Sequence, residues 1–230
     1  MRHPAVRRVD FGYFVRPAAE SGTGAAVVQP CLGYLIEHPD AVLLFDSGMA
    51  THPQVEAHYR PRRRSLPAAL AAAGTRVSDV DMVVNCHLHF DHCGGNPELP
   101  GRPVFTQRVE LAAARATADY TLPGLVDAAG LVYEELDGEA EILRGVLVVP
   151  TPGHTDGHQS LVVRGADGTV VVAGQSHDTA TDYSNDALAW RAHREGHAAA
   201  VVPTRAWLDR LQRLDPARVV FAHDHCVWQP

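Results

Sequence analysis

The stretch that decides the fold is His87-Leu88-His89-Phe90-Asp91-His92, which directly follows the apolar run Met82-Val83-Val84-Asn85-Cys86. Neutral imidazole is a good ligand for zinc and similar divalent ions, and carboxylate adds a harder oxygen ligand. If the strand continues into this H-x-H-x-D-H cluster, His87 and His89 point to one face, because a strand alternates its faces. Asp91 and His92 then lie beyond the strand end, where a loop can turn them toward a second ion. Metal binding explains the cluster better than a polar loop with incidental histidines.

Composition predicts one globular domain that spans residues 1–230. The chain is 46% apolar and 20% charged, which suits a folded domain of this length. Its net charge of −7 argues against a nucleic-acid partner, whose electrostatic footprint is a basic face. One basic run, Arg60 and 62–64 around Pro61, is interpreted as a solvated loop, with a lid or anion-contacting role as the alternative.

A cytoplasmic location and a small-molecule substrate are expected. Residues 1–10 lack the apolar core of a signal peptide, and no segment approaches the roughly 18 unbroken apolar residues of a membrane span. No membrane association is therefore expected. The scattered cysteines contain no C-x-x-C pair and suit a reducing compartment; they are Cys31, Cys86, Cys93 and Cys226. The sequence gives no indication of the oligomeric state.

Short apolar runs and turn residues predict strands that alternate with helices in an α/β fold. The runs at 34–37 and 42–45 are joined through His38-Pro39-Asp40 and predict a hairpin. Ser65 predicts the start of a helix over 66–73, which Gly74 ends. Two more helices are predicted, one over 107–116 and one that Thr204 caps and that ends at 214. The remaining predicted strands are 141–143, 146–149, 161–163, 170–173 and 218–222.

Two further histidines lie where the predicted strands end. His154 belongs to the loop Thr151-Pro152-Gly153-His154-Thr155-Asp156-Gly157-His158, which follows a strand. His223 lies at the end of the last strand, in Phe221-Ala222-His223-Asp224. Strand ends are where a rigid scaffold presents functional loops, so both histidines are candidate ligands.

The pattern resembles the metallo-β-lactamase superfamily from about residue 32 to residue 224. The resemblance is carried by Phe45-Asp46-Ser47-Gly48-Met49, by the histidine cluster followed by Cys93-Gly94-Gly95-Asn96, and by the T-P-G-H loop at 151–154. Within the superfamily, the chain looks most like the N-acyl homoserine lactone hydrolases, which are quorum-quenching lactonases. That likeness rests on Gln107-Arg108-Val109-Glu110 and on Gly157-His158-Gln159-Ser160-Leu161.

This resemblance implies a four-layer αβ/βα sandwich that holds two metal ions between the edges of two sheets. Zn²⁺ is the expected ion, with Mn, Fe or Co as alternatives. Asp46 would orient a ligand imidazole through its other nitrogen, or would serve as a turn-forming aspartate. The implied ligands are His87, His89 and His154 for one ion, and Asp91, His92 and His223 for the other.

One ligand position departs from the superfamily. A bridging aspartate usually follows the strand at 170–173, and this chain has Gln175 there. Two dications about 3.5 Å apart repel by roughly 19 kcal/mol even at an effective dielectric constant of about 20, so the loss of an anion should weaken the second site. A Gln carbonyl oxygen can still coordinate. Two ions are favoured because the six other ligand positions are intact. Alternatively, a nearby carboxylate such as Asp178 or Asp182 supplies the missing negative charge, or the site holds a single ion.

A second departure lies three residues further on. Similar lactonases often carry a tyrosine there, whose hydroxyl steadies the developing oxyanion, whereas this chain has Asp178. An ionised carboxylate would repel an oxyanion, so Asp178 must be turned away, protonated or used differently. Tyr183 is near in sequence, but the sequence does not place its hydroxyl. His158 is expected to support His154 or to hydrogen-bond its loop.

The resemblance implies a hydrolase in which a metal-bound hydroxide opens an ester-like carbonyl, most plausibly that of a lactone such as an N-acyl homoserine lactone. The metal lowers the pKa of a bound water toward about 7, and Asp91 is the expected catalytic residue, shuttling a proton to the leaving alkoxide. A glyoxalase II-type thioester hydrolase is the alternative enzyme, although no clear basic segment for glutathione is present. A non-catalytic metal-binding relative, disabled by Gln175, is the other alternative.

Overall fold

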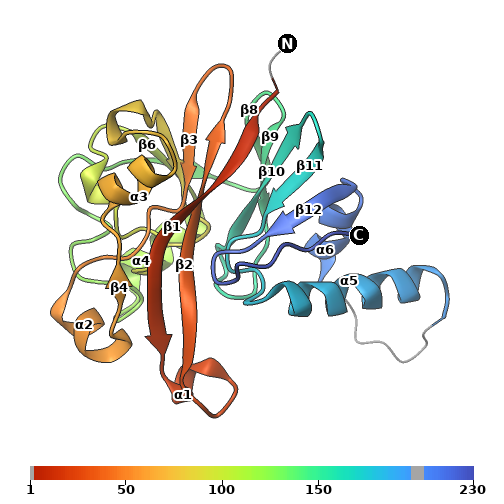
Figure 1. The fold of residues 1–230 in the computed structure, drawn as a ribbon, viewed down its shortest axis with the longest axis horizontal. Coiled ribbons are helices and arrows are strands. Elements are labelled where there is room, and N and C mark those ends of the chain that lie inside the picture. Colours follow the sequence, from red (N-terminus) through yellow and green to blue (C-terminus); the bar gives the residue numbers. More distant parts are fainter. Residues whose placement is uncertain (1–2, 198–204) are drawn as a thin grey trace.

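Two β-sheets face each other and carry helices on their outer sides in the computed structural model, which describes residues 3–197 and 205–230 (Figure 1). Within these ranges seven strands form the first sheet and five form the second. In sheet order, the first contains β4 Arg62–Arg63, β1 Ala5–Arg16, β2 Val27–Glu37, β3 Val42–Phe45, β5 Met82–Val84, β6 Pro103–Gln107 and β7 Val132–Leu136. The second contains β12 Pro216–Val220, β11 Gly168–Val172, β10 Gln159–Gly165, β9 Val146–Pro150 and β8 Ala140–Leu143.

The helices complete the expected four-layer αβ/βα arrangement. Helices α2 and α3 pack against the first sheet, and α5 and α6 pack together outside the second. Within the described ranges, every helix is too short or too polar to cross a membrane. The helices are α1 Ala18–Ser21, α2 Pro53–Tyr59, α3 Leu66–Ala72, α4 Arg108–Ala116, α5 Ala180–Arg194 and α6 Ala206–Gln212, with 3₁₀ turns at Val77–Asp79 and Asn96–Glu98.

Apolar side chains on both faces of the central strands build three hydrophobic layers. In β10, Leu161 and Val163 join the layer between the two sheets, whereas Val162 joins the layer beneath α5 and α6. In β3, Phe45 faces the other sheet and Leu44 faces the helices of the first sheet. Strands covered on both sides have near-continuous apolar sequences, which explains why apolar runs rather than alternating patterns mark them.

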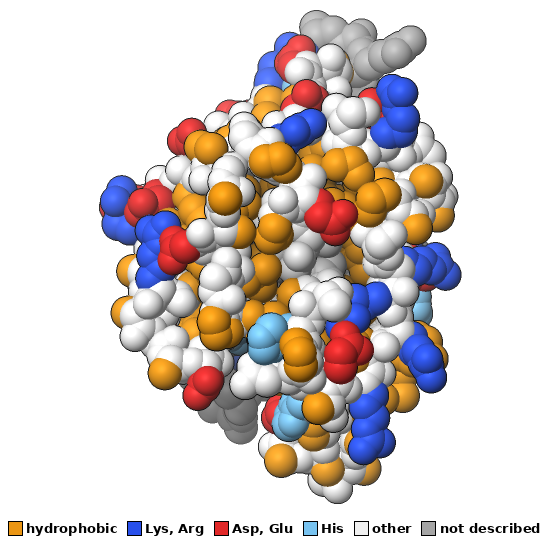
Figure 2. Space-filling model, turned by 90° about the vertical axis from the view of Figure 1, so that its left-hand side faces the viewer, with side chains coloured by type: hydrophobic (Ala, Val, Ile, Leu, Met, Phe, Trp, Pro, Cys, Tyr) orange, Lys and Arg blue, Asp and Glu red, His pale blue; other side chains and the backbone are white. Residues whose placement is uncertain are grey.

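The outer face of the first sheet and its helices is shown in Figure 2. Charged side chains of both signs lie around a band of hydrophobic side chains on this face. The charge on this face is therefore mixed in sign.

Most of the predicted elements are confirmed. The hairpin pairs Tyr34 with Phe45, and the helix that follows Ser65 ends before Gly74, which has a φ of 82°. The last strand ends at Val220, two residues earlier than predicted, and Thr204 lies outside the described residues. The long strand β1 and helix α5 were not predicted. Helix α5 mixes polar residues with few apolar ones and buries only Tyr183 and Ala187, so its hydrophobic periodicity is weak.

Strand direction brings the predicted ligands to one edge of the sandwich. Strands β3 and β5 run parallel, so Asp46 and the histidine cluster follow neighbouring strand ends. Strands β11 and β12 are also parallel, so Gln175 and His223 leave the second sheet side by side. Backbone hydrogen bonds join the sheets at this edge, from Leu32 N to the Ala222 carbonyl at 2.9 Å and from Gln159 N to the Cys86 carbonyl at 2.8 Å.

Gly94 allows the end of the histidine loop to pack directly against the loop after β3. Its N–H donates to the Gly48 carbonyl at 2.8 Å, and a Cβ at Gly94 would lie 1.9 Å from Ala50 N. Backbone atoms cannot yield to such an overlap, so only glycine fits. The Gly-Gly pair after the cluster is therefore a packing requirement of the loop that carries the ligands.

We expect Gly94→Ala to lower the free energy of unfolding by about 3 kcal/mol, because the methyl group must displace the loop after β3. Gly165→Ala is the matched control, since a Cβ there has ordinary contacts of 3.4 Å. Urea unfolding followed by circular dichroism measures both. Equal stability of the two variants would contradict the prediction.

Candidate metal centre

The sequence predicted that the strand continues through His87 and His89. In the structure, the histidine cluster lies in a loop instead. Strand β5 ends at Val84, and the N–H groups of His92 and Cys93 both donate to the His89 carbonyl, at 3.1 and 3.2 Å. The chain therefore turns tightly through the cluster. This turn, rather than strand alternation, directs the imidazoles.

Three imidazole nitrogens converge at the first group of candidate ligands. His89 Nδ1 lies 2.9 Å from His87 Nε2 and 3.2 Å from His154 Nε2. Nitrogens that bind one zinc ion tetrahedrally at about 2.0–2.1 Å lie about 3.3 Å apart, so these separations suit a single shared ion. His87 is fully buried, whereas His89 is partly exposed.

Asp91, His92 and His223 form the second group. Asp91 Oδ2 lies 3.5 Å from His92 Nε2 and 3.4 Å from His223 Nε2. All three side chains are buried, and His223 Nε2 has no hydrogen-bond partner within the described structure. A buried polar atom without a partner is costly, and a cation between the three ligand atoms would remove that cost.

The opposite edges of these imidazoles are held by other groups. Asp46 Oδ2 lies 2.9 Å from His92 Nδ1, and Asp46 Oδ1 accepts a hydrogen bond from Cys86 N at 2.8 Å. His223 Nδ1 donates to the Pro30 carbonyl at 2.9 Å. Each contact places the N–H on Nδ1 and leaves Nε2 facing the second group. Asp46 has a φ of 59°, so it also forms the turn after β3.

Cys86 forms a third possible group with His87 and His92. Its Sγ lies 3.1 Å from His87 Nδ1 and 3.2 Å from His92 Nδ1. Burial raises the pKa of the Cys86 thiol well above its usual value, so the thiol stays protonated at neutral pH. Cys86 Sγ faces the Nδ1 edges of these imidazoles, whereas the first and second groups form around their Nε2 edges.

The two groups differ in their protonation. Burial lowers the pKa of His87, and lowers those of His89 and His154 to about 4 and about 3, so these three imidazoles are neutral at pH 7. Burial also lowers the pKa of His92, but Asp91 and Asp46 outweigh it and raise the pKa to about 9. Burial raises the pKa of Asp91, but the neighbouring imidazoles, His92 foremost, outweigh it and leave Asp91 ionised.

Gln175 reaches the second group directly. Its Oε1 lies 3.2 Å from His92 Nε2, and its Nε2 donates to Asp178 Oδ1 at 3.1 Å. The other Asp178 oxygen accepts from Arg16 Nη1 at 2.8 Å. Burial raises the pKa of Asp178, but hydrogen bonds and the charge of Arg16 outweigh it and lower the pKa overall, so this carboxylate is ionised and paired.

His158 and Tyr183 take structural positions. His158 Nδ1 donates to the Thr151 carbonyl at 3.1 Å, and His158 Nε2 accepts from Gln175 N, also at 3.1 Å. His158 thus hydrogen-bonds two site loops. The Tyr183 hydroxyl accepts from Gln212 between α5 and α6 and is buried in the outer hydrophobic layer. The structure therefore places the Tyr183 hydroxyl between α5 and α6 rather than among the candidate ligands.

Glu110 ties the two histidine-bearing loops together. Its fully buried carboxylate accepts from Leu88 N at 2.8 Å and from the Thr155 hydroxyl at 2.7 Å, and it also accepts from the Tyr120 hydroxyl. A Cβ on Gly157 would lie 2.5 Å from Glu110 N, so the loop presses against this residue. The sequence motif contained Glu110, but only the fold reveals which loops it joins.

An aromatic wall adjoins the second group, and no sequence signal identified it. The Phe14 ring meets the His223 ring edge-on at a centroid distance of 5.5 Å, and Tyr59 stacks on Phe90 at 4.7 Å. On the other side, Tyr120 lies 4.9 Å from the His89 ring. Aromatic rings therefore adjoin both groups of candidate ligands.

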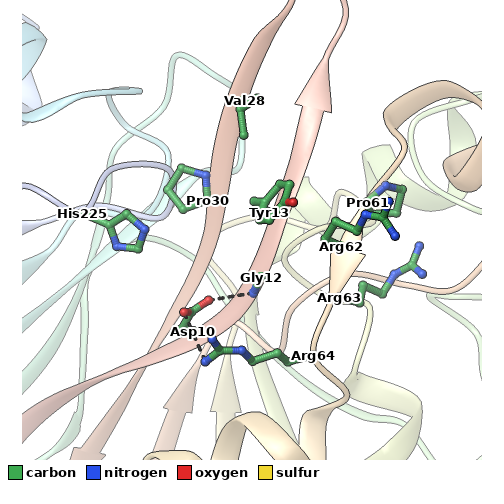
Figure 3. Close-up of a pocket in the computed structure, with 10 residues that line it drawn as sticks. All are labelled: Asp10, Gly12, Tyr13, Val28, Pro30, Pro61, Arg62, Arg63, Arg64 and His225. Carbon is green, nitrogen blue, oxygen red and sulfur yellow. Dashed lines mark hydrogen bonds and ion pairs between the residues drawn. The ribbon is translucent and has the colours of Figure 1, made fainter.

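The basic run is exposed at Arg60, Arg62 and Arg64, as a solvated segment should be, but part of it is a short strand rather than a loop. Arg62 and Arg63 form β4 and pair with Tyr13 and Gly12 of β1. Residues 62–64 line a hollow of about 770 Å³, and Arg64 is paired with Asp10 at 3.2 Å. Figure 3 shows these arginines across the hollow from Pro30 and His225. The lining of this hollow includes none of the six predicted metal ligands.

The four-layer sandwich and its strand-end ligand groups define a class of metallohydrolase scaffold, and comparison with known proteins identifies the family. The profile of the metallo-beta-lactamase superfamily matches residues 26–223. The chain belongs to this superfamily.

The relatives are N-acyl homoserine lactonases, as the motifs indicated. The Bacillus cereus enzyme is 31% identical over 147 residues, a match that covers 58% of each chain. The Azorhizobium caulinodans lactonase AttM is 28% identical, and the match covers 90% of this chain and 86% of AttM. A solved N-acyl homoserine lactone hydrolase with N-hexanoyl-L-homoserine at its catalytic metal center has a TM-score of 0.77, 23% identity and coverage of 98% of this chain and 95% of that chain.

We expect Glu110→Ala to lower the free energy of unfolding by about 3 kcal/mol, because the buried donors of Leu88 and Thr155 lose their acceptor. Glu98→Ala removes an exposed carboxylate and is the control. Urea denaturation compares the two variants with the parent. Indistinguishable midpoints would show that Glu110 does not hold the loops.

The stability of chelator-treated protein should be highest near neutral pH. His89 and His154 have folded pKa values below the unfolded value of about 6.5, so their contribution is fully present above pH 6.5 and is lost as pH falls from there toward about 4 and 3. His92 has a folded pKa of about 9, so its contribution is present below pH 6.5 and is lost as pH rises through 9.

Urea midpoints at pH 5, 7 and 9.5 in excess chelator test this expectation. The midpoint should be highest at pH 7, and His92→Gln should remove the alkaline loss. A midpoint that rises steadily to pH 9.5 would contradict the assignment of a protonated His92.

Proposed function

We propose that this protein is a metal-dependent hydrolase that opens an ester-like carbonyl, with an N-acyl homoserine lactone as the substrate class. One observation carries the proposal: within the described structure two separate sets of ligand atoms converge, one around His89 and a fully buried one around Asp91. The lactonase relatives support the substrate class. Because the matched Bacillus enzymes are covered over only 58% of their length, the activity is assigned here as a proposal.

The proposed ligands follow the two convergent groups. His87, His89 and His154 would hold one ion, and Asp91, His92 and His223 would hold the other. Nitrogen-rich donor sets suit zinc, and the same donors accept Mn, Fe or Co. When bound, such ions polarise a carbonyl oxygen and lower the pKa of water toward about 7.

Asp91 is the proposed catalytic residue. Its carboxylate is buried, ionised and held between two imidazoles, so it can orient the attacking water and accept a proton from it. The same carboxylate can return the proton to the leaving alkoxide. Asp178 is not positioned to stabilise an oxyanion, because its charge is paired with Arg16.

The aromatic wall supports an acyl substrate. Phe14, Tyr59 and Phe90 pack on one another beside His223, with Phe14 and Phe90 centroids 6.2 Å apart. An acyl chain placed against them would be shielded from water. By contrast, a glutathione thioester needs a cationic site for its carboxylates, and the nearby Arg16 is already paired.

We also propose that residues 1–230 act as one domain in the cytoplasm. Loops from both sheets contribute candidate ligands, which supports a single functional unit. The four cysteines are free, as suits a reducing compartment.

The decisive experiment measures hydrolysis of N-hexanoyl homoserine lactone by protein purified without chelator, together with metal content by elemental mass spectrometry. We expect about two ions per chain and activity that excess chelator abolishes. Asp91→Asn should lower kcat at least about 100-fold, because the proton acceptor is lost. Asp127→Asn, which removes an exposed partner of Arg115, should leave kcat unchanged.

Three results would redirect the proposal. Faster turnover of an acyl-glutathione thioester would favour the thioester hydrolase. Bound metal without hydrolysis of either substrate would favour a binding protein. Activity that survives complete removal of metal would exclude the mechanism.

A further inference from the structure

A continuous line of side-chain contacts leads from the surface to the second ligand group. Arg16 Nη1 donates to Asp178 Oδ2 at 2.8 Å, and Gln175 Nε2 donates to Asp178 Oδ1 at 3.1 Å. Gln175 Oε1 then lies 3.2 Å from His92 Nε2. Gln175 is buried, and Asp178 is about one-third exposed. The line therefore connects a charged surface pair with the position where the superfamily usually carries a bridging aspartate.

The backbone beneath Gln175 is held independently of its side chain. Gln175 N donates to His158 Nε2 at 3.1 Å, and the preceding Gly174 has a φ of 58°. A Cβ on Gly174 would lie 2.5 Å from Cys86 Cβ, so the chain at this point is packed against the loop of the first sheet. What remains to be fixed is the direction of the terminal amide of Gln175.

Asp178 fixes that direction by chemistry. An ionised carboxylate only accepts hydrogen bonds, so it must face the NH₂ end of the Gln175 amide. The carbonyl oxygen is thereby turned toward His92 and the second ligand group. If the amide were reversed, its oxygen would face the Asp178 carboxylate, and its NH₂ group would face the ligand atoms proposed to hold the second ion.

The charge of Asp178 does not itself replace the missing bridging aspartate. Arg16 pairs with it at 2.8 Å, and the side chain of Arg16 is largely covered. The pair is close to neutral as a unit, so its effect on an ion is exerted through the amide dipole that it aligns. Asp178 therefore acts through Gln175, and neither as a metal ligand nor as a compensating charge.

We propose that Asp178 is a positioning residue that holds the Gln175 carbonyl oxygen toward the second ion, so that a neutral amide serves where the superfamily usually uses an aspartate. This inference rests on the two-ion form of the proposed function. Removal of Asp178 lets the amide rotate and deprives the second ion of an oriented oxygen. Within the described structure the first group, His87, His89 and His154, forms no hydrogen bond with Asp178 or Gln175, and it should bind its ion as before.

The test is stepwise titration of chelator-treated protein with Co²⁺, followed by visible absorption and by competition with a metal indicator. Outer-shell partners of metal ligands typically contribute about 10- to 100-fold in affinity, so Asp178→Ala should raise the Kd of the second ion by that factor. The Kd of the first ion should stay constant. Asp127→Ala removes an exposed carboxylate from the Arg115 pair and should change neither constant.

Asp178→Asn separates orientation from packing, since it preserves size. Arg16 should capture the Asn carbonyl oxygen, because charge-assisted hydrogen bonds are the stronger ones. The Asn NH₂ group would then face Gln175 and favour the reversed amide. We therefore expect Asp178→Asn to weaken the second ion about as much as Asp178→Ala, and thermal unfolding identifies any loss caused by misfolding.

A double-mutant cycle with Gln175→Ala decides between action through the amide and action through space. In the Gln175→Ala background, Asp178→Ala should cause no further change in the second Kd. A full additional loss in that background would overturn the positioning role, as would an unchanged second Kd in both single Asp178 variants. A parent chain that binds one ion overturns this inference together with the two-ion function, whereas two ions in the parent and no Asp178 effect overturn this inference alone.

Discussion

Imidazole nitrogens that face one another at hydrogen-bond distance are the constraint on which this structure depends. His87, His89 and His154 are neutral at pH 7 because burial lowers the pKa of each, so their mutual approach at 2.9–3.2 Å offers at most a hydrogen bond between tautomers. The surrounding structure must therefore hold these imidazoles in place. The two sheets do so by bringing several strand ends to one edge, so that each ligand loop starts from a fixed point.

The loops are then held by groups that never face the ligand atoms. Asp46 fixes His92 and the backbone of Cys86 with one carboxylate, and Glu110 joins the loop at Leu88 to the loop at Thr155 with another. Gly94 and Gly157 let these loops approach backbone atoms that any side chain would strike. The organisation of the centre is therefore a matter of buried carboxylates and close backbone contact as much as of histidines.

Local sequence could predict the features that depend on neighbouring residues. The histidine cluster, the T-P-G-H loop and the apolar runs of the sheets were all identified from short segments. The remaining features depend on contacts between distant segments. Asp178 and Arg16 are 162 positions apart, and Thr155 and Glu110 are 45 apart, so no spacing rule could pair them. The short strand within the basic run was missed for the same reason, since β4 exists only by pairing with β1.

The division of the ligands between the two sheets also sets when a complete centre can exist. His223 is oriented by the carbonyl of Pro30, 193 positions earlier in the chain, and it stands opposite Asp91 from the first sheet. During synthesis, the emerging H-x-H-x-D-H segment has only part of each donor set and none of the opposing sheet. Both convergent donor sets thus exist only in the finished fold, after the ribosome has delivered β12 and the residues that follow it.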